Sequence, residues 1–88
     1  MTTVTISLKT DNLRDYNVAM SALDPTIKAI AAHFNGSASM GPMIEHGKPT
    51  LCARFNNEAD ADAFIQEVKV GEKILAKAKF PALDIKKG

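Results

Sequence analysis

The side chains with the widest chemical range in this sequence are one cysteine, Cys52, and two histidines, His33 and His46. A zinc site usually needs about four cysteine, histidine or carboxylate ligands at close spacing. The chain contains no CxxC and no HxxxH arrangement, so we expect no bound metal. We interpret His33 as a residue near a helix C-terminus, where a cation is favoured, and His46 as a hairpin-turn residue.

Cys52 is the candidate nucleophile. A catalytic thiol needs an activating base or a neighbouring cation. Arg54 shares a strand face with Cys52, but local spacing places no histidine beside it. We therefore interpret Cys52 as a passive sheet residue.

Other motifs of catalysis are also missing. Asp60 and Asp62 lie at a helix start, where acidic residues are favoured in any case. The glycine- and serine-bearing stretch 36–41 follows a helix, whereas a phosphate-binding loop precedes one. We expect no cofactor and no enzymatic activity.

The first half of the chain predicts a strand and a long helical segment. Val4, Ile6 and Leu8 alternate with polar residues, which indicates a half-buried strand over 3–9. Thr10 or Asp11 is the expected cap of the next helix. An apolar stripe with helical spacing then comprises Leu13, Tyr16, Met20, Leu23, Ile27, Ile30 and Phe34. Because proline removes a backbone donor, Pro25 predicts two helical segments, about 12–23 and 25–34, that are nearly in line or kinked.

The second half predicts a hairpin, a helix and a last strand. Strands are expected over 37–45 and 49–55, joined at His46–Gly47, with Gly41–Pro42 confining the first to a sheet edge or a bulge. Asn56 or Asn57 is expected to begin a helix, and with Asn57 as the cap Asp60 falls at the capping-box position. Gly71 is the expected end of this helix, although 72–77 fit a resumed helix. Residues 71–80 fit either a helix or a strand, and 82–86 fit a strand.

The order strand, helix, strand, strand, helix, strand predicts an α+β fold. It is the ferredoxin-like βαββαβ sandwich, with a four-stranded antiparallel sheet and helices on one face. Residues 1–88 are expected to form a single domain. A helical bundle is the alternative, but it leaves the alternation at both ends unexplained.

Charge and aromatic content bear on nucleic acid. RNA-recognition domains share this order and stack bases on strand aromatics, but here Thr5, Ser7, Thr50 and Cys52 occupy those positions. Residues 1–68 sum to −3 and residues 69–88 to +4. Nucleic acid is therefore not an expected partner, and binding through the C-terminal lysines is expected to be weak or absent at physiological salt.

The remaining expectation is protein binding. We predict a flat sheet face of small hydroxyl residues with Arg54 on it, beside an edge flanked by two methionines, since arginine and methionine are enriched at interfaces. The candidate interaction residues are Met40, Met43, His46, Thr50, Cys52, Arg54, Lys77 and Lys79.

These observations predict a small non-enzymatic protein-binding or regulatory domain, such as an inhibitor or accessory protein of bacterial or phage type. Its partner is another protein or a second copy of the chain. Two alternatives stay open: a dimeric α+β-barrel ligand binder or small enzyme, and a nucleic-acid binder. The lone cysteine, with no export signal and no apolar run of membrane-spanning length, predicts a cytoplasmic protein without membrane contact.

Overall fold

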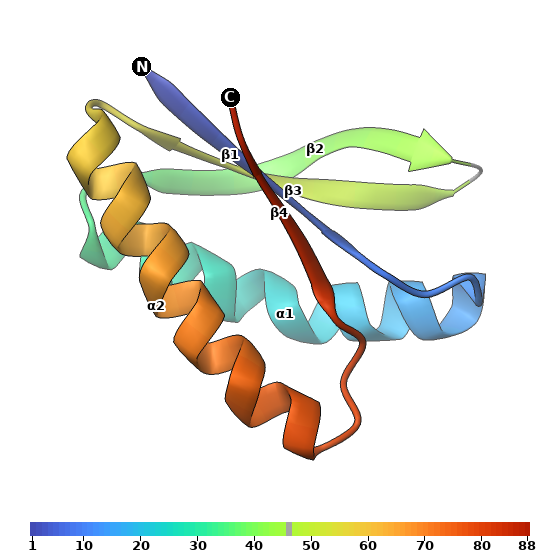
Figure 1. Cartoon of the computed structure of the whole chain (residues 1–88). Coiled ribbons are helices and arrows are strands. Elements are labelled where there is room, and N and C mark those ends of the chain that lie inside the picture. Colours follow the sequence, from blue (N-terminus) through green and yellow to red (C-terminus); the bar gives the residue numbers. More distant parts are fainter. Residues whose placement is uncertain (46) are drawn as a thin grey trace.

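The computed structural model describes residues 1–45 and 47–88, and at positions 42, 44 and 45 it describes the backbone alone. In chain order the elements are β1 (Thr2–Leu8), α1 (Leu13–His33), β2 (Ser37–Glu45), β3 (Lys48–Phe55), α2 (Glu58–Lys77) and β4 (Leu83–Lys87). The four strands form one antiparallel sheet in the order β2-β3-β1-β4. Both helices lie on one face of this sheet (Figure 1), which confirms the predicted ferredoxin-like α+β sandwich.

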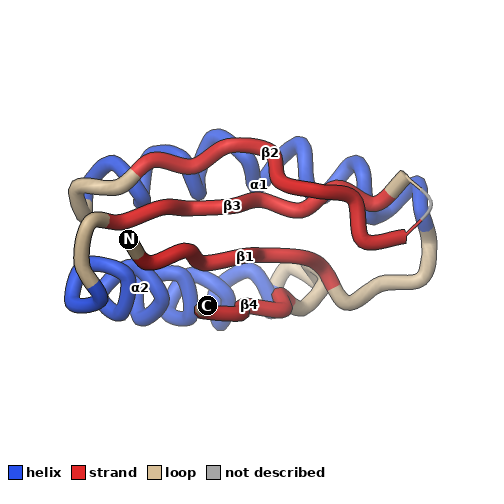
Figure 2. Tube along the Cα trace, turned by 90° about the horizontal axis from the view of Figure 1, so that it is seen from above, coloured by secondary structure: helices blue, strands red, loops and turns tan. Residues whose placement is uncertain are grey.

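The two helices cover different halves of the sheet. Figure 2 shows α1 behind the β2–β3 half and α2 behind the β1–β4 half. The strands at the two ends of the sheet, β2 and β4, each have a neighbour on one side only. The edge of β2 is therefore available to another chain.

One hydrophobic core lies between the sheet and the helices. Val4 and Ile6 pair with Ala53 and Leu51, and all four are buried. The phenyl rings of Phe55 and Phe64 join β3 to α2, with centroids 5.0 Å apart. The alternation of the strands and the helical spacing after Asn57 predict eight core residues, and all belong to this cluster, with Ile65 only partly buried: Val4, Ile6, Leu8, Leu51, Phe55, Phe64, Ile65 and Val68.

Helix α1 differs from the prediction at both its start and its middle. Its cap is Asn12, whose side-chain oxygen accepts a hydrogen bond from the backbone nitrogen of Asp15 at 3.0 Å. The helix then runs unbroken through Pro25, so the predicted division at this residue is wrong. Leu23 and Ile27 are both buried, which keeps the apolar stripe in phase across the proline. Burying such side chains stabilises by about 1.5–3 kcal/mol each, which offsets a proline penalty of about 3 kcal/mol.

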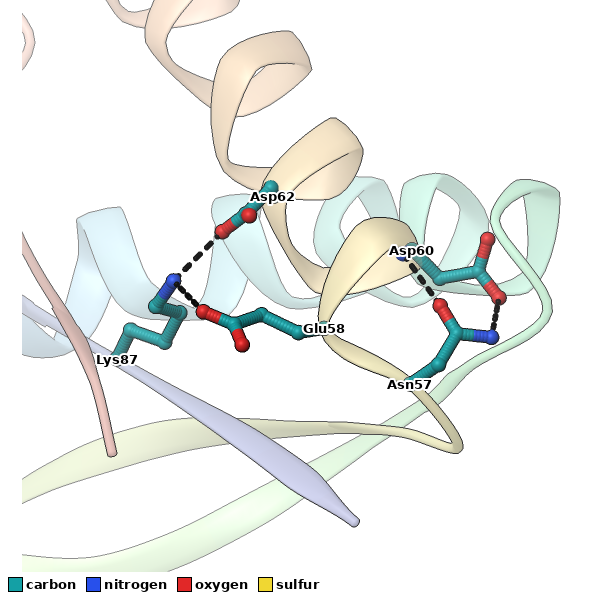
Figure 3. Close-up of polar contacts among 5 residues, drawn as sticks. All are labelled: Asn57, Glu58, Asp60, Asp62 and Lys87. Carbon is teal, nitrogen blue, oxygen red and sulfur yellow. Dashed lines mark hydrogen bonds and ion pairs between the residues drawn. The ribbon is translucent and has the colours of Figure 1, made fainter.

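Helix α2 begins as predicted and ends later. The side chain of Asn57 accepts from the backbone nitrogen of Asp60 at 2.8 Å and donates to its carboxylate at 3.1 Å (Figure 3). The helix passes through Gly71 to Lys77, so the predicted end at Gly71 is wrong. Residues 71–77 are helical and 78–80 form no strand. Packing of Leu75 against the core outweighs the glycine penalty of about 1 kcal/mol.

Both helices end in the same hydrogen-bonded motif. The backbone nitrogen of Gly36 donates to Ala31 at 2.8 Å, and that of Phe80 donates to Leu75 at 3.1 Å. In each case the residue before the donor is left-handed, with φ 62° at Asn35 and φ 61° at Lys79. These are Schellman ends, in which glycine or asparagine is the usual left-handed residue. Lysine at position 79 is therefore unusual.

Candidate interaction surface

The sheet face opposite the helices carries the residues that the sequence assigned to it. Directly paired residues of antiparallel strands point to the same face. The pairs Thr5↔Cys52 and Ser39↔Cys52 form one row across three strands. The pairs Thr3↔Arg54 and Ser37↔Arg54 form the next row. The small hydroxyl residues and Arg54 thus share one face.

The middle of this face is not exposed, contrary to the expected flat platform. Thr50 is 0% exposed and Cys52 is 8% exposed. The cover comes from β2, whose register against β3 shifts between Met40 and Met43. A Cβ atom placed on Gly41 would lie 2.6 Å from Thr50 Oγ1, so the backbone of β2 rests directly on these side chains. Figure 1 shows β2 arching over the sheet near this bulge.

Cys52 is a buried thiol in this arrangement. Its Sγ atom lies 3.9 Å from the hydroxyl oxygen of Thr5, within hydrogen-bond distance for sulfur. His33 lies at the end of α1, as predicted, and its ring meets that of Phe34 edge to face at 5.0 Å. Within residues 1–45 and 47–88 no three metal-ligating side chains gather. His46 lies outside the described residues.

The two methionines are exposed at the sheet edge. Met40 pairs with Leu51 and Met43 pairs with Pro49. Their side chains are 55% and 68% exposed. Methionine is flexible and polarisable, so it adapts to many apolar partners. The candidate surface therefore has its apolar part on β2.

Arg54 and the two candidate lysines lie elsewhere. Arg54 is exposed on β3, at the end of the sheet face where it pairs with Ser37 and Thr3. Lys77 is in the last turn of α2, and Lys79 follows that helix. This segment leads into β4, the edge of the sheet opposite β2. The described candidate residues therefore fall into four groups. These are the buried Thr50 and Cys52, the edge residues Met40 and Met43, Arg54, and the lysines Lys77 and Lys79.

The two lysines of β4 lie on opposite faces of the sheet, and each is close to a carboxylate. Lys87 lies on the helix side of β4, opposite Val4. Its ammonium group is 2.8 Å from the carboxylates of both Glu58 and Asp62 (Figure 3). Hydrogen bonds to Asp62 and Glu58 hold the pKa of Lys87 above its ordinary value. Lys86 lies on the other face, 3.9 Å from Asp84.

Sequence analysis missed exposed apolar residues on the helices. Val18 on α1 is 65% exposed, and Val70 and Ile74 on α2 are 56% and 66% exposed. All three lie outside the buried stripes of their helices. Their position off the apolar stripe is the sequence signal that indicates them.

In comparisons with known proteins, the chain matches no protein-family model and no curated protein. Neither α1 nor α2, the two helices in the described part of the chain, has the length and hydropathy needed to cross a bilayer.

Proposed function

We propose that this chain is a small non-enzymatic protein-binding domain that regulates or assists a larger protein. It binds an extended segment of its partner along the edge of β2. The observation that carries this proposal is the pair of exposed methionines, Met40 and Met43, on a strand with a free edge. A cytoplasmic setting, expected from the lone cysteine, is part of the same proposal.

An edge strand offers both affinity and position to such a segment. Its outward backbone N–H and C=O groups can pair with an added strand. Ser37 to Met40 pair with β3 in unbroken register, so this stretch is straight enough to accept one. The bulge beyond Met40 ends the regular edge. Met43 then supplies an apolar contact beside the docked segment.

The covered sheet face favours this edge over the two alternatives. An α+β-barrel dimer encloses a cleft between two open sheet faces, but here β2 closes the middle of that face over Thr50 and Cys52. A phosphate surface along β4 is disfavoured because the ammonium group of Lys87 is held by Glu58 and Asp62 of α2. Binding of protein through β2 requires neither feature.

A matched pair of variants tests the proposal. Met40→Asp adds a charge at the β2 edge, and Val70→Asp adds the same charge on α2 at nearly equal exposure, 55% against 56%. A photo-crosslinking residue at position 40 should capture a partner from the native cell, and one at position 70 should not. Met40→Asp should abolish co-purification of that partner, while Val70→Asp retains it.

Light scattering identifies the kind of partner. If the wild-type chain is a dimer that Met40→Asp dissociates, the segment on β2 belongs to a second copy. If the chain is monomeric throughout, the partner is a different protein. Equal capture by both aspartate variants, or crosslinks only from position 70, would show the proposal to be wrong.

A further inference from the structure

A groove opens on the helical side of the molecule, between the first half of α1 and the end of α2. Its volume is about 870 Å³, and it is open to solvent along its length. Figure 1 shows the two helices diverging toward this end, where the segment that joins α2 to β4 runs along one side. Its lining residues come from the first half of α1, from the connection between β1 and α1, and from the segment between α2 and β4, and none comes from β2.

Part of the groove surface is apolar. Val18 is 65% exposed there, and Ala19 beneath it is buried. Ala22 and Ala78 are small residues on the two sides. Phe80, half-buried, comes from the connecting segment. Burial of this surface by a ligand is favourable because it removes apolar area from water.

The rim of the groove is basic. Lys9, Arg14 and Lys79 all line it and are exposed, whereas Asp15 is the one acidic lining residue, giving three positive charges against one negative. None of the three cations forms an ion pair with another described side chain. The N-terminus of α1, capped by Asn12, adds its positive dipole end at the same place.

Lys79 reaches this rim from an unfavourable backbone conformation. Its φ of 61° is left-handed, which a residue with a Cβ atom adopts at a steric cost that glycine avoids. Backbone strain of this kind often accompanies functional positions. Glycine would end α2 equally well, but it would leave the rim without this ammonium group.

We propose that this groove binds an acidic amphipathic segment of a partner protein. The apolar side of the segment rests on Val18 and Phe80, and its carboxylates face Arg14, Lys9 and Lys79. Arginine suits this role because its planar guanidinium binds carboxylates through two hydrogen bonds. The complementary charges define the occupant, and the open shape suits a chain segment better than an enclosed small molecule. The groove is a second surface, independent of β2.

The test uses a defined probe. A fluorescein-labelled helical peptide of about four turns carries leucine along one face and glutamate along the other. Its control has lysine in place of glutamate. With the full-length chain, fluorescence anisotropy should show binding of the acidic peptide only, weakening as salt increases. Amide NMR shifts should change at Val18, Ala22 and Phe80 and stay constant at Ser37 and Ser39.

Variants separate charge from fold. Lys79→Gly should weaken binding of the acidic peptide by up to about fivefold. The helix end should remain, because glycine favours it. Arg14→Gln should weaken peptide binding by a similar factor. Lys69→Gln is the control, since Lys69 is an exposed lysine of α2 that does not line the groove. Met40→Asp should leave peptide binding unchanged. A negative result for the groove can therefore be distinguished from a negative result for the β2 edge.

Three outcomes would overturn the inference. Equal binding of the lysine peptide would show that the basic rim does not select the ligand. Binding of decanoate alone, with the same NMR shifts and no response to the acidic peptide, would assign the groove to a small anionic amphiphile. Shifts at Val18 and Phe80 that depend only on protein concentration would assign it to a second copy of the chain.

Discussion

Gly41 lies so close to Cys52 that a Cβ atom on the glycine would be 2.4 Å from the cysteine Sγ. This contact joins the bulge of the edge strand β2 to the central strand β3. It also explains why Cys52 is buried on a sheet face that has no helix over it. A side chain at position 41 would therefore force Cys52, Thr50 or the bulge of β2 to shift.

Gly41→Ala is expected to destabilise the protein. Overpacking of this kind costs about 1–3 kcal/mol, because the methyl group meets both Cys52 Sγ and Thr50 Oγ1. Gly71→Ala is the matched control, since its Cβ would meet nothing within 4 Å. In the middle of a helix that change should stabilise by up to about 1 kcal/mol. Urea unfolding measures both free energies of unfolding.

The double variant Gly41→Ala with Cys52→Ala identifies the cause. Removing Sγ should restore part of the lost stability, giving a coupling energy of about 0.5–3 kcal/mol. If Gly41→Ala is as stable as the wild type, or if the two effects simply add, the close approach of β2 to Cys52 is wrong.

Pro25→Ala is expected to stabilise the protein, because Pro25 is exposed inside the continuous helix α1. The change restores a backbone donor and should add up to about 3 kcal/mol. Thr26→Ala, at the next exposed position, is the control. It should raise the free energy of unfolding by up to about 0.7 kcal/mol through helix propensity alone. Thermal unfolding distinguishes them, since 1 kcal/mol shifts the Tm of a domain this size by about 4–8 °C.

A loss of stability with Pro25→Ala would indicate that the proline fixes a break that α1 needs. The present structure excludes such a break, because backbone helix continues on both sides of the residue.

Pro25 also shows where sequence reasoning reaches its limit. Alternation predicted the strands over 3–9 and 49–55, and helical spacing predicted the buried stripe of α1, because both patterns follow directly from which face meets the core. A local rule about proline then overrode the stripe. The in-phase burial of Leu23 and Ile27 is a tertiary effect that outweighs this local preference. The predicted helix end at Gly71 failed for the same reason, because Leu75 and Phe80 beyond it pack against the core.

The candidate surface was harder to foresee than the fold. The faces of Thr50 and Cys52 followed from alternation, but their burial depends on the path of β2 across them. That path is set by a register shift between Met40 and Met43, which no spacing rule encodes. The groove between the helices depends on how far α1 and α2 diverge, and this is a property of packing alone.

Lys87→Met is expected to loosen the end of β4. The ammonium of Lys87 links this edge strand to Glu58 and Asp62 at the start of α2. Hydrogen exchange should become faster at the backbone amides of β4, whereas Lys86→Met, whose Lys86–Asp84 distance is 3.9 Å, should change it little. Equal effects of the two changes would contradict the role given to Lys87.

The same link has a defined dependence on pH. The pKa of Lys87 is raised in the folded chain by hydrogen bonds to Asp62 and Glu58, so the folded state holds this proton more tightly than the unfolded state. Its contribution is fully present below the ordinary lysine pKa of about 10.4 and is lost as the pH rises through the higher folded value. The wild type should therefore lose more stability in strong alkali than Lys87→Met does.

Lys79→Gly is expected to raise the Tm, whatever occupies the groove. The left-handed conformation, with φ 61°, costs a lysine about 1–2 kcal/mol that glycine does not incur. Asn35→Gly tests the same position at the end of α1, where φ is 62°. Its gain should be smaller, because asparagine adopts this conformation more readily than lysine. Thermal unfolding of the two variants compares the gains directly, and a lower Tm for Lys79→Gly would show that the Lys79 side chain makes a stabilising contact. A higher Tm combined with weaker binding of the acidic peptide would show that position 79 trades stability for recognition, as expected of a strained residue at a binding site.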